Sequence, residues 1–133
     1  MEKIKAWIVD DEIDARSLIR GLVDEYCPNI EVIGESIDID GAWDKLRKEK
    51  PQLVYLDINM PRGSGLDLLL RFPLRKFEVI VISAYADNEQ ELHNTKDIAF
   101  LQKPYSIDKF LKLSKEAVDR IQQNPNKIYR SIH

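Results

Sequence analysis

The sequence has very few of the side chains that build disulfides and zinc sites. It contains one cysteine, Cys27, and two histidines, His93 and His133, among 133 residues. A single cysteine cannot form an internal disulfide, and this usage is typical of a reducing cytosol, so we expect a cytoplasmic location. The histidines lie far outside zinc-ligand spacing. No base stands near Cys27 in the sequence, so we expect neither a zinc centre nor a reactive thiol.

Long apolar runs and an excess of positive charge are also missing. No uninterrupted apolar run approaches the length of a membrane span, and the opening MEKIKAWIVDD has no apolar core of signal-peptide length. The net charge of −3 lacks the basic footprint of a nucleic-acid binder. We therefore expect no membrane partner and no nucleic acid bound by this domain. A hydrophobic content of 44% over 133 residues suffices for one domain with a buried core.

Short apolar stretches alternate with helical patterns along the chain. The spacing of apolar residues predicts helices over residues 13–26, 39–46, 66–70 and 106–121. The apolar stretches between them predict five strands: KAWIVDD, EVIGES, LVYLDI, EVIVISA and AFLQKP. This alternation is typical of an α/β domain of the doubly wound (βα)5 type, in which helices cover both faces of a parallel sheet.

Several aromatic and aliphatic residues are candidates for the core. Trp7 and Trp43 fall within predicted elements, and we expect both to be buried. On the first and last helices the apolar positions recur at helical spacing and predict the faces that pack on the sheet. These positions are Leu18, Ile19, Leu22, Val23 and Tyr26 on the first helix, and Ile107, Phe110, Leu111, Leu113, Ala117, Val118 and Ile121 on the last.

Chemically active side chains stand where the predicted strands end. Asp10 and Asp11 end the first strand, and Asp57 ends the third. Ser83 ends the fourth strand and Lys103 ends the fifth. In a parallel sheet the carboxyl ends share one edge, and sites form there near the point where the strand order reverses. We therefore expect three carboxylates, one hydroxyl and one ammonium group to converge.

The three carboxylates would repel one another unless a cation joined them. Two like charges about 4 Å apart repel by roughly 4 kcal/mol at an effective dielectric of about 20. Mg²⁺ prefers oxygen ligands and commonly shares carboxylates with phosphate oxygens. We therefore expect Mg²⁺ to be held by Asp10, Asp11 and Asp57, with the backbone carbonyl of Asn59 as a further ligand. Lys103 could hold a phosphoryl oxygen, and Asp57 could act as a nucleophile that forms an aspartyl-phosphate.

Taken together, these motifs resemble a response-regulator receiver domain of bacterial two-component signalling. The likeness extends over about residues 4–122 and implies the flavodoxin-like fold, with the five parallel strands in the order 2-1-3-4-5. The matching segments are the Asp10–Asp11 pair, DINMPRGSGLDLL around Asp57, Ser83–Ala84 after an apolar strand, and FLQKP, which ends in Lys103–Pro104.

The resemblance implies a role for each residue at the predicted edge. Asp57 would accept a phosphoryl group from a phosphohistidine on a sensor histidine kinase, with Mg²⁺ as cofactor. Lys103 and Ser83 would bind the phosphoryl oxygens, and the Lys103–Pro104 bond would be cis. Ser83 would shift toward the phosphoryl group and Phe100 would turn inward behind it, which favours an active arrangement of the domain. The domain would catalyse only its own phosphorylation and slow dephosphorylation.

Two segments depart from the family pattern. Residues 86–97, where the fourth helix is expected, have Leu92 as their only large apolar residue. We therefore expect this stretch to be short, mobile or partly unwound. The polar segment 123–133 contains Pro125 and turns basic, as linkers do. We expect a receiver domain over residues 1–122 and a tail or linker after it.

The resemblance leaves the output of the domain open. The style of the segment around Asp57 and the short gap from Ser83 to Lys103 are similar to receivers fused to LytTR-type DNA-binding domains. The chain could be a stand-alone regulator or the receiver portion of a longer protein. It would control an output partner or a fused effector domain, as a monomer or as a homodimer that phosphorylation favours.

Two other functions could use an aspartate in this place. An aspartate-nucleophile phosphatase or hydrolase of the haloacid dehalogenase type would need a second acid two residues after Asp57, where Asn59 stands. A pseudo-receiver, which acts as a pure interaction module, would be expected to lack Asp57, Lys103 or the acidic pair, and all are present. The residues favour the phospho-accepting receiver.

Overall fold

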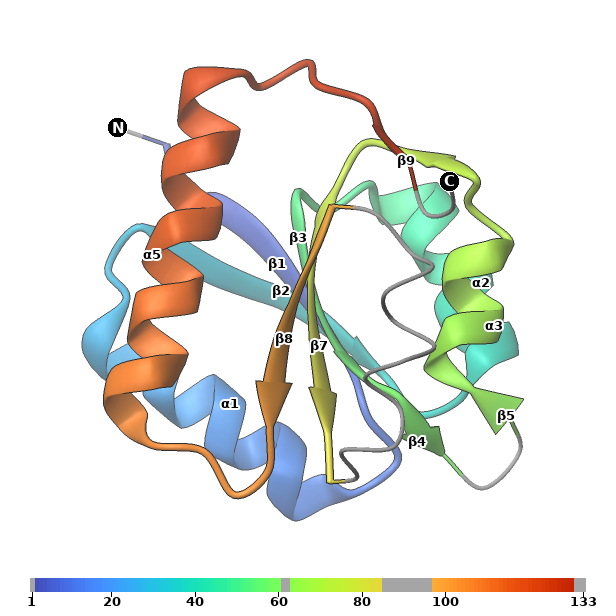
Figure 1. The fold of residues 1–133 in the computed structure, drawn as a ribbon, viewed down its shortest axis with the longest axis horizontal. Helices are drawn as coiled ribbons and strands as arrows, with labels where there is room; N and C mark the ends of the chain where they lie inside the picture. Colours follow the sequence, from blue (N-terminus) through green and yellow to red (C-terminus); the bar gives the residue numbers. More distant parts are fainter. Residues whose placement is uncertain (1, 61–62, 85–96, 131–133) are drawn as a thin grey trace.

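The computed structural model, which describes residues 2–60, 63–84 and 97–130, contains a five-stranded parallel sheet at its centre (Figure 1). The strands lie in the order β2-β1-β3-β7-β8, which is the predicted order 2-1-3-4-5 when the five are counted along the chain. They are β1 (Ile4–Val9), β2 (Ile30–Ser36), β3 (Leu53–Asp57), β7 (Glu78–Ser83) and β8 (Ile98–Gln102). The α/β fold class and the strand order are confirmed.

The two central strands carry the densest part of the core. Every residue of β3 and of β7 is buried, as expected for parallel strands that helices cover on both faces. Both strands end in a polar residue, Asp57 and Ser83, and the two last rungs of their pairing join Leu56 to Val81 and Asp57 to Ile82. Apolar burial along β3 thus fixes where the carboxylate of Asp57 stands.

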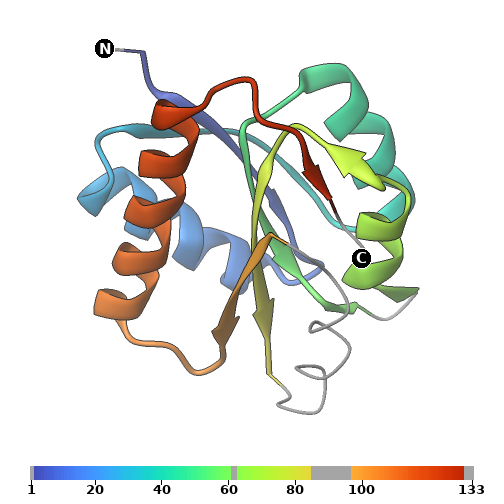
Figure 2. The same ribbon diagram turned by 45° about the horizontal axis from the view of Figure 1, so that its top comes forward.

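In the part of the chain that the structure describes, helices lie on both faces of the sheet, two on each (Figures 1 and 2). On one face lie α1 (Ile13–Tyr26) and α5 (Ile107–Gln123), and on the other lie α2 (Ile39–Glu49) and α3 (Gly65–Leu70). The side chains of Asp38, Ser64 and Ser106 accept hydrogen bonds from backbone N–H groups in the first turns of α2, α3 and α5. In the described part of the chain, no helix is long and apolar enough to cross a membrane.

The core follows the predicted pattern with four exceptions. Trp7 is buried at 5% exposure, and its ring crosses Gly34, where an added Cβ would lie 2.2 Å from the indole. Trp43 is only half-buried and packs edge-on against Phe72. Leu18, Tyr26 and Ile107, which were expected on packing faces, are exposed by 45–52%. These helices present apolar stripes wider than the sheet covers, so their outer members stay in solvent.

Short strands outside the main sheet were not predicted. After Asp57 the chain forms a hairpin of two antiparallel strands of two residues each, β4 (Asn59–Met60) and β5 (Gly63–Ser64). A second antiparallel pair joins β6 (Leu74–Arg75) to β9 (Tyr129–Arg130). The tail therefore differs from a free linker, since Tyr129 is buried at 3% exposure. The boundary between a domain over 1–122 and a tail over 123–133 stays a prediction. Residues 86–96, where a thin fourth helix was expected, lie outside the described residues.

Candidate functional site

Three carboxylates from two strand ends meet at the carboxyl edge of the sheet. Each of Asp10, Asp11 and Asp57 offers one oxygen, and these oxygens lie within 4.8 Å of one another. Asp10 and Asp11 follow β1, and Asp57 ends β3, which lies next to β1 in the sheet. Asp10 and Asp57 are buried, at 1% and 5% exposure, whereas Asp11 is partly exposed. The predicted convergence of these three residues is present.

The Asp57 carboxylate is both buried and held in place. Its Oδ1 accepts a hydrogen bond from the backbone N–H of Asn59 at 3.0 Å. Burial, opposed by this hydrogen bond and reinforced by the nearby Asp10, raises the pKa of Asp57 to about 6. An ionised Asp57 is therefore unfavourable in the metal-free domain, and a cation at this place would relieve it.

Asp10 is the most deeply buried acid of the site. Its Oδ1 accepts the backbone N–H of Glu12 at 2.9 Å, and its Oδ2 is buried without a hydrogen-bond partner among the described residues. Burial raises the pKa of Asp10, while the Glu12 N–H and the Lys103 ammonium oppose that shift. The Lys103 Nζ stands 3.9 Å from Oδ2, which makes a long ion pair. One buried carboxylate oxygen is thus available to a cation.

Ser83 and Asn59 are joined across two strands. The Ser83 hydroxyl, fully buried at the end of β7, donates a hydrogen bond to Oδ1 of Asn59 at 2.9 Å. The backbone at the end of β7 also receives the Lys103 N–H, which donates to the Ser83 carbonyl at 2.7 Å. The sequence predicted a role for Asn59 as a metal ligand through its backbone carbonyl and did not predict this side-chain contact. The contact follows from the register of β3 and β7, which puts residue 59 just past the end of β3 and beside the end of β7.

The last predicted members of the site lie on and after β8. Lys103 follows β8, and the Lys103–Pro104 peptide bond is cis, as the resemblance implied. The Lys103 side chain is 29% exposed and its ammonium points toward Asp10. Phe100, in the middle of β8, is half-buried and packs against the core on the α2–α3 face. Its inward turn on phosphorylation stays a prediction.

Gly65 brings the first turn of α3 against the end of β3. An added Cβ at Gly65 would lie 2.8 Å from the carbonyl oxygen of Asp57 and 3.0 Å from the Cα of Ile58. The Gly65 N–H donates to the Ile58 carbonyl at 3.0 Å. This close approach fixes the backbone that carries Asp57, and it explains why a glycine stands at position 65.

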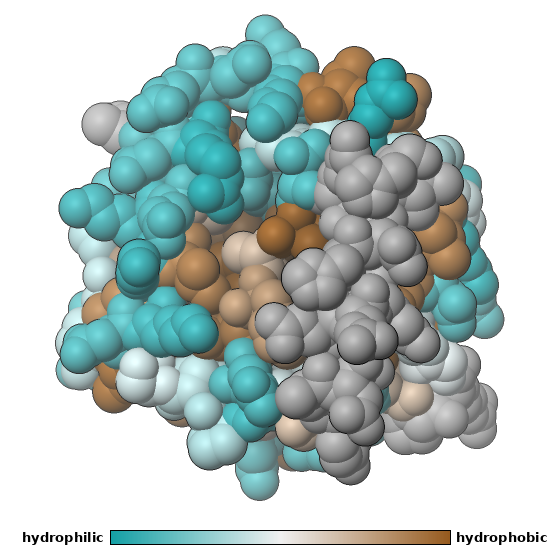
Figure 3. Space-filling model, viewed as in Figure 1, coloured by the Kyte–Doolittle hydropathy of each residue, from teal (hydrophilic) through white to brown (hydrophobic). Residues whose placement is uncertain are grey.

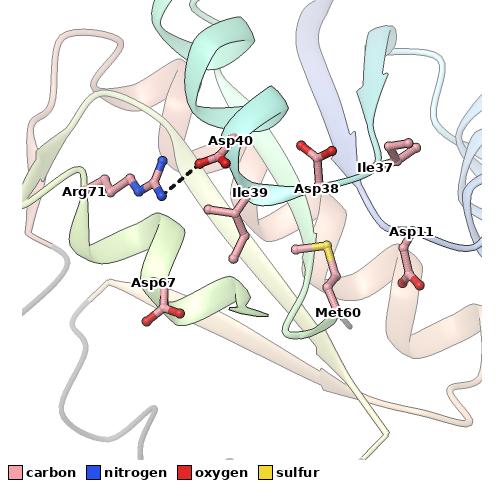
Figure 4. A pocket seen from close by; sticks show the side chains of 8 residues that line it. All are labelled: Asp11, Ile37, Asp38, Ile39, Asp40, Met60, Asp67 and Arg71. Carbon is pink, nitrogen blue, oxygen red and sulfur yellow. Dashed lines mark hydrogen bonds and ion pairs between the residues drawn. The ribbon is translucent and has the colours of Figure 1, made fainter. Parts of the chain in front are cut away.

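A cavity of about 500 Å³ opens beside Asp11, on the α2–α3 side of the site (Figure 4). Its lining residues are Asp11, Ile37, Asp38, Ile39, Asp40, Met60, Asp67 and Arg71. Three of its acids already have partners, because Asp40 pairs with Arg71 at 3.0 Å and Asp38 and Asp67 accept backbone N–H groups at helix starts. Asp11 at its rim is the carboxylate that connects this cavity with the acidic cluster.

The donor set at the strand ends fits a hard divalent cation. Mg²⁺ takes oxygen ligands and keeps waters beside one or two carboxylates. The cluster offers three carboxylates, one of them with a buried oxygen that lacks a hydrogen bond, and the hairpin after Asp57 brings the Asn59 backbone close. In the described part of the chain this is the only group of three or more His, Cys, Asp or Glu residues able to hold a metal.

Comparisons with known proteins agree with this geometry. The family model described as the response regulator receiver domain matches residues 6–115. A protein-glutamate methylesterase/protein-glutamine glutaminase from Syntrophomonas wolfei is 37% identical over 106 residues, which are 78% of this chain and 30% of that protein. An uncharacterised response regulatory protein from Shewanella oneidensis is 33% identical over 113 residues, which are 84% of this chain and 48% of that protein. The chain spans less than half of each relative.

Solved structures show the same fold. The receiver domain of AraT, a response regulator from Geobacillus stearothermophilus, superposes with a TM-score of 0.79 at 26% sequence identity. The superposition covers 91% of this chain and 97% of that one. The overall fold of this chain is thus shared with the receiver domain of another response regulator.

Proposed function

The chain belongs to the response regulator receiver family, and we propose that within this two-component receiver Asp57 is the phosphoacceptor. Asp57 stands at the carboxyl edge of the sheet, buried beside two further acids; Lys103 pairs with one of these acids, Asp10, and Ser83 ends the adjacent strand β7. The single observation that carries this proposal is the convergence of three carboxylates, one hydroxyl and one ammonium group, spread over positions 10 to 103, at one sheet edge.

The proposed reaction is transfer of a phosphoryl group from a phosphohistidine of a sensor histidine kinase. A carboxylate oxygen of Asp57 attacks phosphorus, the P–N bond breaks with its electron pair, and the imidazole leaves. Oδ1 of Asp57 is held by the Asn59 N–H, so we assign the attack to Oδ2. The Lys103 ammonium and the Ser83 hydroxyl would hold the phosphoryl oxygens, which makes catalysis a matter of positioning and charge.

Receiver domains bind Mg²⁺ at an acidic pocket, and the Asp10–Asp11–Asp57 cluster is that pocket in this chain. We assign the metal to these three carboxylates and to the Asn59 carbonyl. The ion would neutralise the repulsion between carboxylates and the charge on the phosphoryl oxygens. The residues themselves orient the acceptor, since hydrogen bonds from Glu12 and Asn59 fix Asp10 and Asp57.

The proposal also covers the partners of the domain and its location in the cell. The phosphodonor would be a cytoplasmic kinase domain, and the receiver would switch an output partner or a fused effector domain. The relatives include methylesterases, of which this chain matches 30% in one case and 39% in another. We propose a domain over residues 1–122 that is no enzyme beyond its own phosphorylation and dephosphorylation.

The decisive experiment is phosphorylation by a small acyl-phosphate donor in the presence of Mg²⁺, followed by intact-protein mass spectrometry. A gain of one phosphoryl group is expected in the native chain and in Asp67→Asn, which changes an acid of the adjacent cavity. No gain is expected in Asp57→Asn or in samples with excess chelator. Modification of Asp57→Asn, or steady turnover of a general phosphate ester, would refute the assignment and favour a hydrolase.

A further inference from the structure

The C-terminal tail is docked at the end of the sheet opposite Asp57, and the phosphoryl chemistry does not use it. Figures 1 and 2 show β9 beside β6, away from the ends of β7 and β8 that point to the site. The pairing is antiparallel, with Tyr129 opposite Arg75 and Arg130 opposite Leu74. Figure 3 shows that hydrophilic side chains cover α5 on this side of the molecule. Yet Tyr129, one residue before the end of the described chain, is 3% exposed.

Two cationic side chains, an arginine and a lysine, contact the ring of Tyr129. The Arg75 guanidinium carbon lies 5.5 Å from the ring centroid and the Lys127 Nζ lies 4.8 Å from it, both within cation–π range. Arg75 is 1% exposed, and its Nε donates to the carbonyl of Phe77 at 3.0 Å. The tail therefore acts as a cover over a buried arginine.

An ion pair between Glu78 and Arg120 lies close to Tyr129, and all three residues line one cavity. Glu78, 2% exposed at the start of β7, receives the Arg120 guanidinium of α5 at 3.0 Å on Oε1. Oε2 of Glu78 and the hydroxyl of Tyr129 are buried and have no other hydrogen-bond partner among the described residues, and burial together with the Glu78 carboxylate raises the pKa of this hydroxyl. A cavity of about 240 Å³ adjoins both residues. Undocking would hydrate these groups, and this offsets part of what the docked ring gains.

Asp97 connects this cover to the sheet. The Arg75 side chain donates to the Asp97 carbonyl, and the Arg130 backbone N–H donates to the Asp97 carboxylate at 3.5 Å. Asp97 directly precedes β8 and has a left-handed backbone, with φ of 59°. The docked tail thus holds the first residue before β8 from two sides.

The other end of β8 leads into the phosphoryl site. Lys103 follows the strand, its N–H is bonded to the Ser83 carbonyl, and its ammonium faces Asp10. β8 is, like β2, an edge strand of the five-stranded sheet, and among the described residues it pairs with β7 alone. The five residues of β8 therefore connect Asp97 at one end with Lys103 at the other.

We propose that residues 127–130 form a strap that is docked while Asp57 is unmodified and released when Asp57 carries a phosphoryl group. A phosphoryl group draws Lys103 and Ser83 toward it, and β8 shifts. Asp97 then loses its hydrogen bonds from the Arg75 side chain and from the backbone N–H of Arg130. This inference rests on the proposed function of Asp57, but the strap and its anchor are separate from the acidic site.

Thermodynamic reciprocity gives the coupling a second signature. If loading Asp57 loosens the strap, loosening the strap must strengthen loading by the same factor. Tyr129→Ala, which removes the ring, is expected to bind the phosphoryl analogue beryllofluoride with Mg²⁺ roughly 3- to 10-fold more tightly. Tyr129→Phe keeps the ring between its cations and removes only the hydroxyl, so it is expected to bind far more nearly as the native chain does.

A backbone variant tests the same strap with less loss of packing. Arg130→Pro removes the N–H that donates to Asp97, whereas Arg130→Ala keeps it. Only the proline variant is expected to share the tighter beryllofluoride binding of Tyr129→Ala. Unchanged exchange rates in the amides of β3 establish that each variant retains the fold.

The test is hydrogen exchange of the full chain with and without Mg²⁺ and beryllofluoride. Loading is expected to raise exchange in the amides of residues 127–130 by roughly threefold or more while β3 stays protected. If the analogue loads but the tail amides exchange at the same rate or more slowly, or if Tyr129→Ala binds it no more tightly, the strap is refuted and the phosphoacceptor is not. If nothing loads on the native chain, the proposed function itself fails, and the coupling with it.

Discussion

The hydroxyl of Ser83 donates its hydrogen bond to the side-chain oxygen of Asn59, at 2.9 Å, across the gap between β7 and the hairpin after β3. A serine hydroxyl has one proton to donate. If that proton is to reach a phosphoryl oxygen on Asp57, this bond must break first. The amide of Asn59 therefore competes with the phosphoryl group for the switch residue.

Removal of the Asn59 amide is expected to favour the loaded state. In Asn59→Ala the backbone carbonyl, our assigned metal ligand, stays, while Ser83 loses the acceptor that competes with the phosphoryl oxygens. Beryllofluoride affinity should rise by roughly 2- to 5-fold, in line with a net hydrogen-bond contribution of about 0.5–1 kcal/mol. Mg²⁺ affinity should change little. Calorimetric titrations with Mg²⁺ alone and with Mg²⁺ plus beryllofluoride check both, and a large loss of Mg²⁺ affinity would assign the amide itself to the metal.

Asp57→Asn is expected to stabilise the metal-free domain at neutral pH. Burial raises the pKa of Asp57 from 3.8 to about 6 in the folded chain, so ionisation favours the unfolded state. The penalty is absent below pH 3.8, develops between 3.8 and about 6, and is complete above it, where two pKa units correspond to roughly 3 kcal/mol as an upper bound. Asparagine keeps the acceptor for the Asn59 N–H and removes the charge.

Thermal unfolding at two pH values tests this sign. With chelator present, Asp57→Asn should unfold at a higher temperature than the native chain at pH 7, and the difference should shrink toward pH 4. Asp67→Asn, whose acid lies in the neighbouring cavity outside the cluster, serves as the control and should show no such gain. Equal unfolding temperatures at pH 7 would mean that the buried acid is fully compensated without a metal.

Lys103→Met is expected to change the two ligands in opposite directions. The ammonium stands 3.9 Å from Oδ2 of Asp10, so it partly neutralises the carboxylate that would bind a cation and also repels the cation. Without it, Mg²⁺ affinity should rise by roughly 2- to 5-fold, the effect of one partly screened charge. Beryllofluoride binding should fall at least tenfold because a partner of the phosphoryl oxygens is gone. Parallel losses of both affinities would place Lys103 in the metal site instead.

The sequence predicted the sheet and the acidic edge because a few local signals determine them. Continuous apolar runs specify buried parallel strands, and the residues that end such strands must share an edge. This reasoning placed Asp10, Asp11 and Asp57 together without any knowledge of distances. The order of the strands came from the resemblance, since alternation alone does not define it.

Other features could not be predicted, for physical reasons. The contact of Ser83 with Asn59 depends on the exact register of two strands and on a rotamer. Tyr129 sits in a polar segment with no periodicity, and its burial depends on Arg75, which lies more than fifty positions earlier. Leu18 and Ile107 were expected inside and are exposed, because periodicity marks an apolar stripe without saying how much of it the sheet covers.

Gly65→Ala is expected to destabilise the domain and to impair phosphorylation. The added methyl would stand 2.8 Å from the Asp57 carbonyl and 3.0 Å from the Ile58 Cα, both backbone atoms that cannot turn aside. The helix start must retreat from the strand that carries the acceptor, at a cost of roughly 1–3 kcal/mol. The matched control is Gly21→Ala, in the middle of α1, where nothing lies within 4 Å of the new Cβ. That change should stabilise by about 0.5–1 kcal/mol, because alanine is the better helix former.

Urea unfolding of the two glycine variants, together with their acyl-phosphate reactivity, separates packing from propensity. Gly65→Ala should have a lower midpoint and slower gain of the phosphoryl group, whereas Gly21→Ala should have a higher midpoint and an unchanged rate. The slope of the transition should be the same in both, since each unfolds the same surface. If Gly65→Ala kept native stability and rate, the approach of α3 to β3 would be loose, and the placement of Asp57 would have to depend on its own hydrogen bond to Asn59.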